Sequence, residues 1–256
     1  MLLIEYRIKL PISYDHYQIA HLHATMEMSK EYTPSSADSA VEILENVPCD
    51  PACLPNQTNS GRKAVAKVQC TSKRYYIPDS LVSAAGLNSV ILRESSFNGF
   101  PNFRTTVTAE SGATGEFTVD TVCRKGDNDA NKDNVFRLPQ AILDKRGVVD
   151  IDIVNDELPA TLARDDEDPK KVLGLGEDWQ ASLIPRLSMV VYKLVFVGGV
   201  GRNINALVMD SLQKMFTVFH RKLVCSQDRL RGLNIEDIRT MEAETKDLLD
   251  KKRKGE

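Results

Sequence analysis

Apolar and polar residues alternate along most of the first two-thirds of the chain, which is the spacing of half-buried strands. The alternation over residues 5–12 predicts a first strand, and Asp15 is placed to cap a helix that follows it. Alternating segments predict further strands at 41–47, 65–71, 90–95, 103–109, 116–124, 148–154 and 189–197. The three strands between 90 and 124 are separated by Gly-containing turns and therefore predict an antiparallel meander.

The last third of the chain changes to helical spacing. Apolar residues recur at three- and four-residue steps from Ile204 to Leu223, and a narrower apolar stripe runs from Ile235 to Leu249. Short helical turns are predicted at 78–85 and 138–145. Many strands with one early and two late helices indicate an α+β fold.

Composition and charge narrow the classes of function. The 256 residues fit one large domain or two small ones, and 42% hydrophobic with 27% charged residues is ordinary for a globular protein. The net charge of -3 argues against nucleic acid as a partner, because nucleic-acid binders usually carry a basic face. The apolar start is interrupted at Glu5 and no membrane-spanning apolar run follows, so we expect a cytosolic protein.

Residues that carry catalytic or metal chemistry are sparse. No Gly-x-Ser-x-Gly elbow or phosphate-binding glycine loop occurs, and His21 and His23 point to different faces of the predicted helix, which argues against a metal site. The cysteines lack paired metal spacing and are expected to be free thiols: Cys49, Cys53, Cys70, Cys123 and Cys225. An enzyme of similar fold is a further alternative, but it needs a buried acid, base or nucleophile that the sequence does not display.

Five segments in register along the chain resemble those of a known family. They are IEYRIKLPIS at 4–13, FNGFPNFRT at 97–105, VYKLV at 191–195, FTVFHR at 216–221 and IEDIRTMEAETK at 235–246. The chain resembles the phosphatidylinositol transfer proteins, and from about residue 2 to about residue 253 it is similar to their soluble single-domain class.

This resemblance implies a single lipid-transfer domain over 1–256 with a START-like helix-grip fold, in which a strongly curved antiparallel sheet surrounds a long helix and encloses a lipid cavity. It also implies a variable loop region at 33–63 and a lid helix at 235–253. It implies a cytoplasmic monomer that contacts membranes transiently and carries one phospholipid as cargo, with no other cofactor. Enclosing two acyl chains requires an apolar cavity larger than the roughly 300–1,000 Å³ of usual small-molecule sites. An alternative is a module that presents lipid to an inositol-lipid kinase without transferring it.

The resemblance also implies which residues hold the lipid phosphate. Family members use threonine and lysine side chains from the strands, and the matching positions are Thr105, Thr121 and Lys193. Lysine supplies a point charge and threonine a hydroxyl donor, both suited to a phosphate that all phospholipids share. A family glutamine of the first helix is replaced by His21, which retains a donor.

The inositol ring is held in the family by a threonine, a lysine two residues on, an asparagine, and a glutamate in the last helix. Lys67 and Asn98 match this pattern, while the threonine position falls on Val65 and the glutamate position on Ala243. With two of four polar partners lost, we expect weak or absent selectivity for phosphatidylinositol over phosphatidylcholine.

Membrane contact is expected to differ from that of the family. Two adjacent tryptophans that follow the Tyr-Lys-Leu strand in the family are absent, and a shorter segment replaces them. The apolar residues of that segment are the candidate membrane contacts: Phe196, Val197 and Val200.

Overall fold

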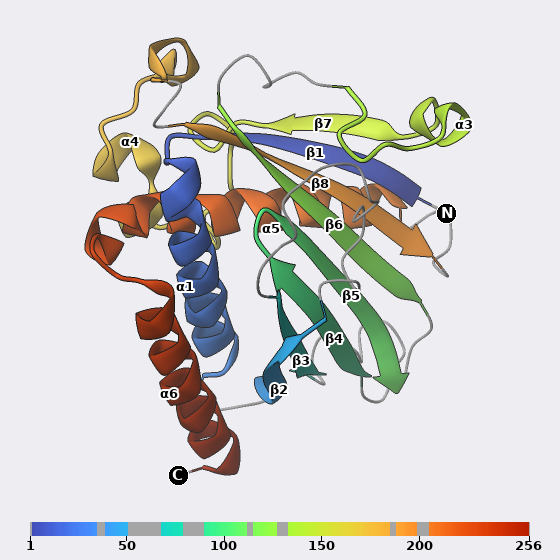
Figure 1. Ribbon diagram of the computed structural model, residues 1–256, viewed down its shortest axis with the longest axis vertical. Coiled ribbons are helices and arrows are strands. Elements are labelled where there is room, and N and C mark those ends of the chain that lie inside the picture. The colour runs from blue at the N-terminus through green and yellow to red at the C-terminus, as the bar shows by residue number, and fades with distance from the viewer. Residues whose placement is uncertain are drawn as a thin grey trace.

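A computed structural model describes residues 2–34, 39–50, 68–78, 90–111, 115–126, 133–184, 188–198 and 205–255. Eight strands form one sheet in the order β2-β3-β4-β5-β6-β8-β1-β7 (Figure 1). Their bounds are β1 Leu2–Leu10, β2 Ala40–Cys49, β3 Val68–Ile77, β4 Val90–Gly99, β5 Asn102–Ser111, β6 Glu116–Lys125, β7 Gly147–Ile151 and β8 Met189–Gly198.

The sheet is mixed rather than antiparallel throughout. Neighbouring strands from β2 to β1 pair antiparallel, and β4, β5 and β6 form the predicted meander. β7 instead pairs parallel with β1, with Ile4 opposite Gly147. The prediction of a wholly antiparallel sheet is therefore wrong at this edge, because the long connection before β7 lets the chain re-enter in the direction of β1.

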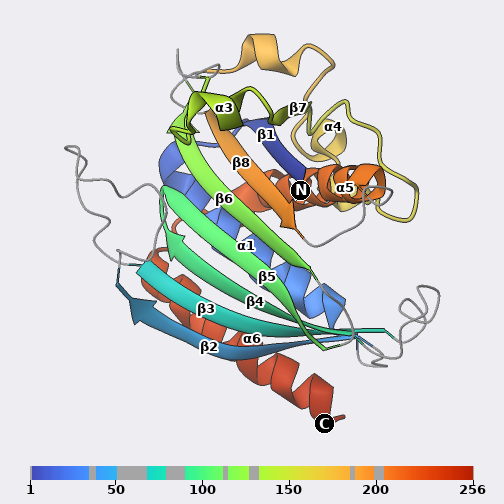
Figure 2. The same ribbon diagram turned by 90° about the vertical axis from the view of Figure 1, so that its right-hand side faces the viewer.

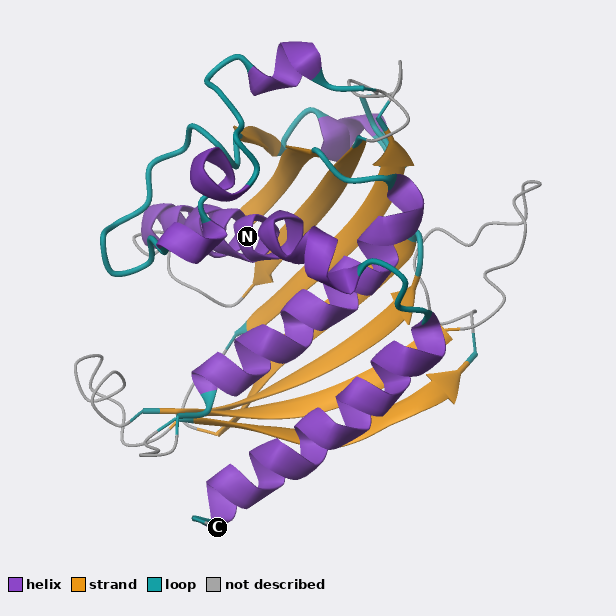
Figure 3. Cartoon of the chain, turned by 90° about the vertical axis from the view of Figure 1, so that its left-hand side faces the viewer, coloured by secondary structure: helices purple, strands orange, loops and turns teal. Residues whose placement is uncertain are grey.

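Three long helices lie on one face of the sheet (Figure 3). They are α1 Tyr14–Tyr32, α5 Asn205–Ser226 and α6 Ile235–Lys254. The shorter helices are α3 Gln140–Leu143, η2 Asp165–Glu167, α4 Pro169–Val172, η3 Trp179–Ser182 and η6 Gln227–Leu230. Figure 2 views the other face of the sheet, where no long helix covers β2 to β6.

The helix ends are fixed by local side chains. Ser13, not Asp15, is the N-cap of α1, and its side chain accepts from the backbone N–H of His16. The capping prediction was therefore two residues late, and Asp15 lies in the first turn, where a carboxylate is also favourable. Asn234 and Asp237 form a capping box at the start of α6, and Gly255 ends it in the left-handed conformation.

The main hydrophobic core joins β1 and β8 to α1 and α5. Alternate residues of β1, namely Ile4, Tyr6, Ile8 and Leu10, are fully buried in it. The strand predicted at 65–71 is described from Val68 and continues to Ile77, and the strand predicted at 148–154 ends at Ile151. The helical turn predicted at 78–85 lies almost wholly outside the described residues.

One disulfide overturns part of the free-thiol prediction. Cys49 at the end of β2 is bonded to Cys70 on the neighbouring strand β3. The two residues are diagonal neighbours across the β2–β3 ladder, within the reach of a disulfide. Cys123 and Cys225 are free and buried, and Cys53 lies outside the described residues.

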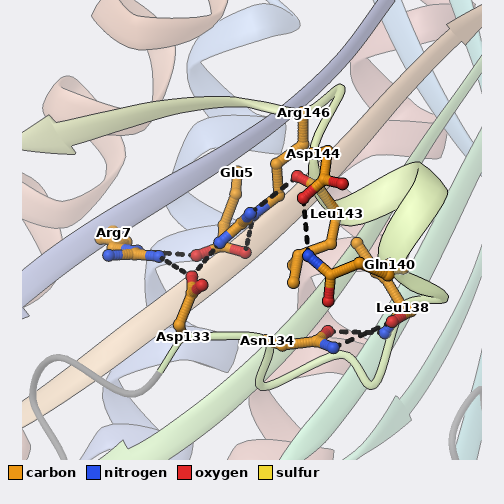
Figure 4. A network of polar contacts seen from close by, with 9 residues as sticks. All are labelled: Glu5, Arg7, Asp133, Asn134, Leu138, Gln140, Leu143, Asp144 and Arg146. Carbon is orange, nitrogen blue, oxygen red and sulfur yellow. Dashed lines mark hydrogen bonds and ion pairs between the residues drawn. The ribbon is translucent and has the colours of Figure 1, made fainter.

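A buried carboxylate ties β1 to the segment that precedes β7 (Figure 4). Glu5 is fully buried and accepts from Arg7 Nε at 2.6 Å and Arg146 Nε at 2.9 Å. Asp133 pairs with the same two guanidinium groups. Because two arginines share two carboxylates, the charges of this cluster balance.

We expect Glu5→Gln to lower the free energy of unfolding by about 3–5 kcal/mol, because it leaves two arginines facing an uncharged buried side chain. Urea denaturation followed by circular dichroism measures the change. Asp144→Asn is the matched control, since Asp144 is exposed and its side chain accepts from the Gln140 amide in the same region. A loss equal to that of the control would contradict the structural role of Glu5.

Candidate functional site

A cavity of about 530 Å³ lies between the sheet and the three long helices. This volume is inside the roughly 300–1,000 Å³ of ordinary small-molecule sites, so the prediction of a larger cavity is wrong for the space bounded by the described residues. Most of the side chains that line it are apolar or uncharged. The cavity therefore suits a largely apolar ligand with a polar end.

The period of the strands decides which side chains reach the cavity. Successive residues of a strand point to opposite faces, so every second residue faces inward. The inward side chains are Thr71, Lys73, Tyr75 and Ile77 of β3, Leu92, Glu94, Ser96 and Asn98 of β4, Phe103, Thr105 and Val107 of β5, Phe117, Val119 and Thr121 of β6, and Lys193 of β8.

Polarity changes along these strands. Asn98 lies at one end of the inward row of β4 and Leu92 at the other, six residues or roughly 20 Å away. Register aligns Leu92 with Tyr75. Asn98 lies opposite Phe103, Phe103 opposite Thr121, and Thr121 opposite Lys193. Apart from the Phe103 ring, the polar groups are thus gathered toward the Asn98 end and the apolar ones toward the Leu92 end, an arrangement that suits an elongated amphiphile.

Lys193 places a cation at the polar end. The residue is 6% exposed, and Nζ donates to Thr121 Oγ1 at 3.3 Å across the β6–β8 ladder. The ammonium also lies 5.1 Å from the ring centre of Phe216 and 5.9 Å from that of Phe219. It forms no ion pair with any carboxylate of the described residues, and burial lowers its pKa to about 8.

Thr105 belongs to a chain of polar groups beside this cation. Ser96 donates its only hydroxyl proton to Glu94 Oε1 at 3.1 Å, so the Thr105 hydroxyl, 3.0 Å away, donates to Ser96. Tyr75 donates to the other Glu94 oxygen at 2.9 Å, and Lys73 Nζ lies 3.9 Å from Oε1. To donate to a ligand in the cavity, the Thr105 hydroxyl has to give up only its neutral hydrogen bond to Ser96.

His21 of α1 stacks on Phe103 with ring centres 4.6 Å apart, and its Nδ1 lies 3.3 Å from the Tyr17 hydroxyl. Burial, then Lys193 and Lys73, lowers its pKa to about 3. The imidazole is therefore neutral at physiological pH. When Tyr17 donates to Nδ1, the other ring nitrogen carries the proton and is a donor toward the cavity.

A second polar cluster connects α6 to β2, β3 and β4. Asn98 donates to Thr71 Oγ1 at 3.3 Å, and Thr71 donates to Asn46 at 3.3 Å. Asn46 in turn donates to Glu242 Oε2 at 2.8 Å, which also pairs with Arg239 at 2.5 Å. These groups supply both donors and acceptors at one end of the cavity, as a polyhydroxylated head group requires.

Of the expected head-group positions that differ from the family pattern, only Ala243 lies among the described residues. Ala243 is exposed on α6, while its neighbour Glu242 lines the cavity. Val65 and Lys67 lie outside the described residues. Thr71 and Lys73 have the same threonine and lysine spacing and both line the cavity. A search for every Thr-x-Lys on the strand, instead of one alignment, would have found them.

The candidate membrane contacts do not form one apolar surface. Val197 is 4% exposed and belongs to the main core, whereas Phe196 is half-buried on the opposite face of β8. Strand alternation thus separates the two, and Val197 cannot contact a membrane in this structure. Val200 lies outside the described residues.

Two further features of the described residues bear on the class of protein. None of the described helices is long and apolar enough to cross a membrane. Within the same ranges, no three side chains of His, Cys, Asp or Glu converge in a way that could hold a metal ion.

Comparison with known proteins places the chain in a family. The family profile described as phosphatidylinositol transfer protein matches residues 1–247. The phosphatidylinositol transfer protein beta isoform of Mus musculus is 30% identical over 99% of the chain and 95% of the mouse protein. Phosphatidylinositol transfer protein 4 of Dictyostelium discoideum is 29% identical over 97% of the chain and 76% of its own length. Protein retinal degeneration B of Drosophila melanogaster is 30% identical over the whole chain, which covers 21% of that longer protein.

Members of the matched family are lipid transfer proteins and not enzymes. The chain belongs to the phosphatidylinositol transfer protein family.

Proposed function

We propose that this protein binds one phospholipid in its internal cavity and transfers it between membranes. The observation that carries the proposal is Lys193, a buried ammonium without a carboxylate partner among the described residues, set at the polar end of a mainly apolar cavity. A buried unpaired charge is costly unless an opposite charge joins it. A lipid phosphate supplies that charge, while the acyl chains cover the apolar wall.

The proposed phosphate site consists of Lys193, Thr121, Thr105 and His21. Lys193 and Thr121 are already in contact, and Thr105 and His21 line the same cavity. Lysine contributes charge, and the two hydroxyls and the neutral imidazole contribute hydrogen-bond donors. Because all phospholipids share the phosphate, this part of the site does not select among them.

The proposed head-group site consists of Thr71, Lys73, Asn98 and Glu242. It contains all four residue types of the family pattern, so the expectation of weak inositol selectivity, which rested on Val65 and Ala243, loses its basis. A site that bonds hydroxyls strongly disfavours ligands that lack them, because its own polar groups are then left unpaired. We therefore propose that phosphatidylinositol is the preferred cargo.

The helix α6 is proposed as the lid of a START-like helix-grip fold. It contributes Glu242 and Thr245 to the cavity and packs on β2 and α1. Its C-terminal end is held by Lys252, which donates to the Thr33 carbonyl, and by Arg253, which pairs with Glu42. We therefore expect this lid to move when a two-chain lipid enters or leaves the cavity.

The proposed attachment to membranes is transient and peripheral. The Cys49–Cys70 disulfide is characteristic of oxidising compartments and does not support the cytoplasmic expectation from the sequence.

We expect Lys193→Met to reduce transfer of phosphatidylinositol and phosphatidylcholine alike by roughly 10- to 100-fold, since it removes the charge while keeping an apolar side chain of similar length. Transfer of fluorescent lipids between liposomes is the measurement. Lys145→Met, at an exposed lysine, is the control. Loss of one lipid only would exclude Lys193 from a shared phosphate site.

Lipid affinity should be constant below about pH 8 and fall by up to tenfold per pH unit above it. The empty site has a Lys193 pKa of about 8, and a bound phosphate raises this pKa because it stabilises the charged form. Equilibrium binding of a fluorescent phospholipid between pH 6.5 and 9.5 tests the expectation. A curve for Lys193→Met with the same slope would assign the titration to another group.

Thr71→Val should reduce the transfer ratio of phosphatidylinositol to phosphatidylcholine by about 2- to 10-fold, and Glu242→Gln should act in the same direction. Ala243→Glu should leave the ratio unchanged, because residue 243 is exposed. Competitive transfer from mixed liposomes measures all three ratios. An increase with Ala243→Glu alone would instead support the alignment that puts the family glutamate at position 243.

A further inference from the structure

The charges that face the cavity can be counted. Among the described lining residues four carry charge at neutral pH: Lys73, Glu94, Lys193 and Glu242. His21 is not among them, since its lowered pKa keeps it neutral. The two lysines and two carboxylates come from four different elements, β3, β4, β8 and α6.

Three of these four charges are compensated within the protein. Glu242 pairs with Arg239, and Lys73 lies 3.9 Å from Glu94, which also accepts from Tyr75 and Ser96. Lys73 additionally donates to Ser29 at 3.2 Å. Lys193 is therefore the single uncompensated charge among the described lining residues.

One uncompensated positive charge in the cavity matches the charge of one class of phospholipid. A phosphodiester whose head group is uncharged carries one negative charge, which Lys193 balances. A phosphomonoester carries about 1.5 to 2 negative charges at pH 7, so part of its charge is left unbalanced in a site shielded from water. Unbalanced buried charge costs far more than the same charge in water, where the dielectric constant is high.

The geometry points to Glu94 as a specificity-determining residue: by pairing with Lys73, it leaves one cation free for the cargo and so excludes lipids that bear a phosphomonoester. The alternative is that Glu94 only stabilises the β3–β4 pair. Its position argues for the first role, because Glu94 faces the cavity between the polar and apolar ends and not the outer surface, where an ion pair stabilises strands without contact with cargo. The inference rests on the proposed function, phospholipid carriage.

The test compares two lipids that lack an inositol ring and differ in phosphate charge. Native mass spectrometry measures the ratio of bound phosphatidic acid to bound phosphatidylglycerol after incubation with liposomes of equal content. Glu94→Gln removes the carboxylate and keeps the side-chain size, so the ratio should rise by about tenfold. Glu45→Gln, at an exposed glutamate of β2, should leave the ratio unchanged.

Two further variants separate charge from structure. Lys73→Met/Glu94→Gln removes both partners and leaves Lys193 as the one free cation, so its ratio should lie well below that of Glu94→Gln. Lys73→Met alone leaves Glu94 unpaired and should lower binding of phosphatidylglycerol relative to phosphatidylcholine. Lys73→Met therefore also tests the role of Glu94 in specificity if the Glu94→Gln protein does not fold.

An unchanged ratio for Glu94→Gln, or the same increase in the double variant, overturns the role of Glu94 while leaving carriage intact. If Glu94→Gln does not fold, an unchanged phosphatidylglycerol to phosphatidylcholine ratio for Lys73→Met overturns it equally. If the unmodified protein binds no phospholipid from any of these liposomes, the proposed function fails and the specificity role fails with it.

Discussion

The burial of one uncompensated ammonium is the constraint on which the rest of the site depends. Lys193 projects from the central strand β8 into a cavity whose wall is mostly apolar, and its neighbours are a hydroxyl and two aromatic rings. These neighbours lessen the cost of burying the charge without removing it, since neither a hydroxyl nor a ring carries a full negative charge. The site is therefore most stable with an anion bound, and its apolar surroundings restrict the anion to one attached to a large apolar body.

The curved sheet converts this local requirement into an oriented binding site. Because inward residues alternate along each strand, a single strand such as β4 presents three polar side chains, Asn98, Ser96 and Glu94, and then the apolar Leu92. Pairing in register aligns the gradients of neighbouring strands, so the polar ends lie together. A one-residue slip would turn every one of these side chains to the other face. The same hydrogen-bond ladder thus fixes both the fold and the direction in which an amphiphile fits.

Sequence patterns predict the local elements well because alternation and helical spacing are local properties. The strands over 90–124 and both late helices are where the spacing predicted them. The parallel pairing of β7 with β1 and the bond between Cys49 and Cys70 depend on which distant segments meet, and spacing along the chain does not report that. The proposed site residues Thr71 and Lys73 differ from the expected positions 65 and 67 for a related reason. A segment of variable length precedes β3, so an alignment carried across it does not fix where a threonine and lysine pattern lies on the strand.

Glu242 shows that assigning a site residue on a helix from an alignment depends strongly on the exact register of that alignment. Adjacent helical residues differ by about 100° around the axis, so one residue of misalignment moves a side chain from the cavity to solvent. Ala243 is exposed and Glu242 faces inward, where it bonds Asn46 of the edge strand β2 and pairs with Arg239 of its own helix. The same carboxylate therefore contacts both the proposed lid and the sheet it covers. Opening of α6 would break the bond to Asn46 and expose the head-group end, whereas a bound inositol hydroxyl could replace Asn46 as a donor. Selection of cargo and closure of the lid would then use one side chain, and the head group that satisfies Glu242 would also favour the closed state.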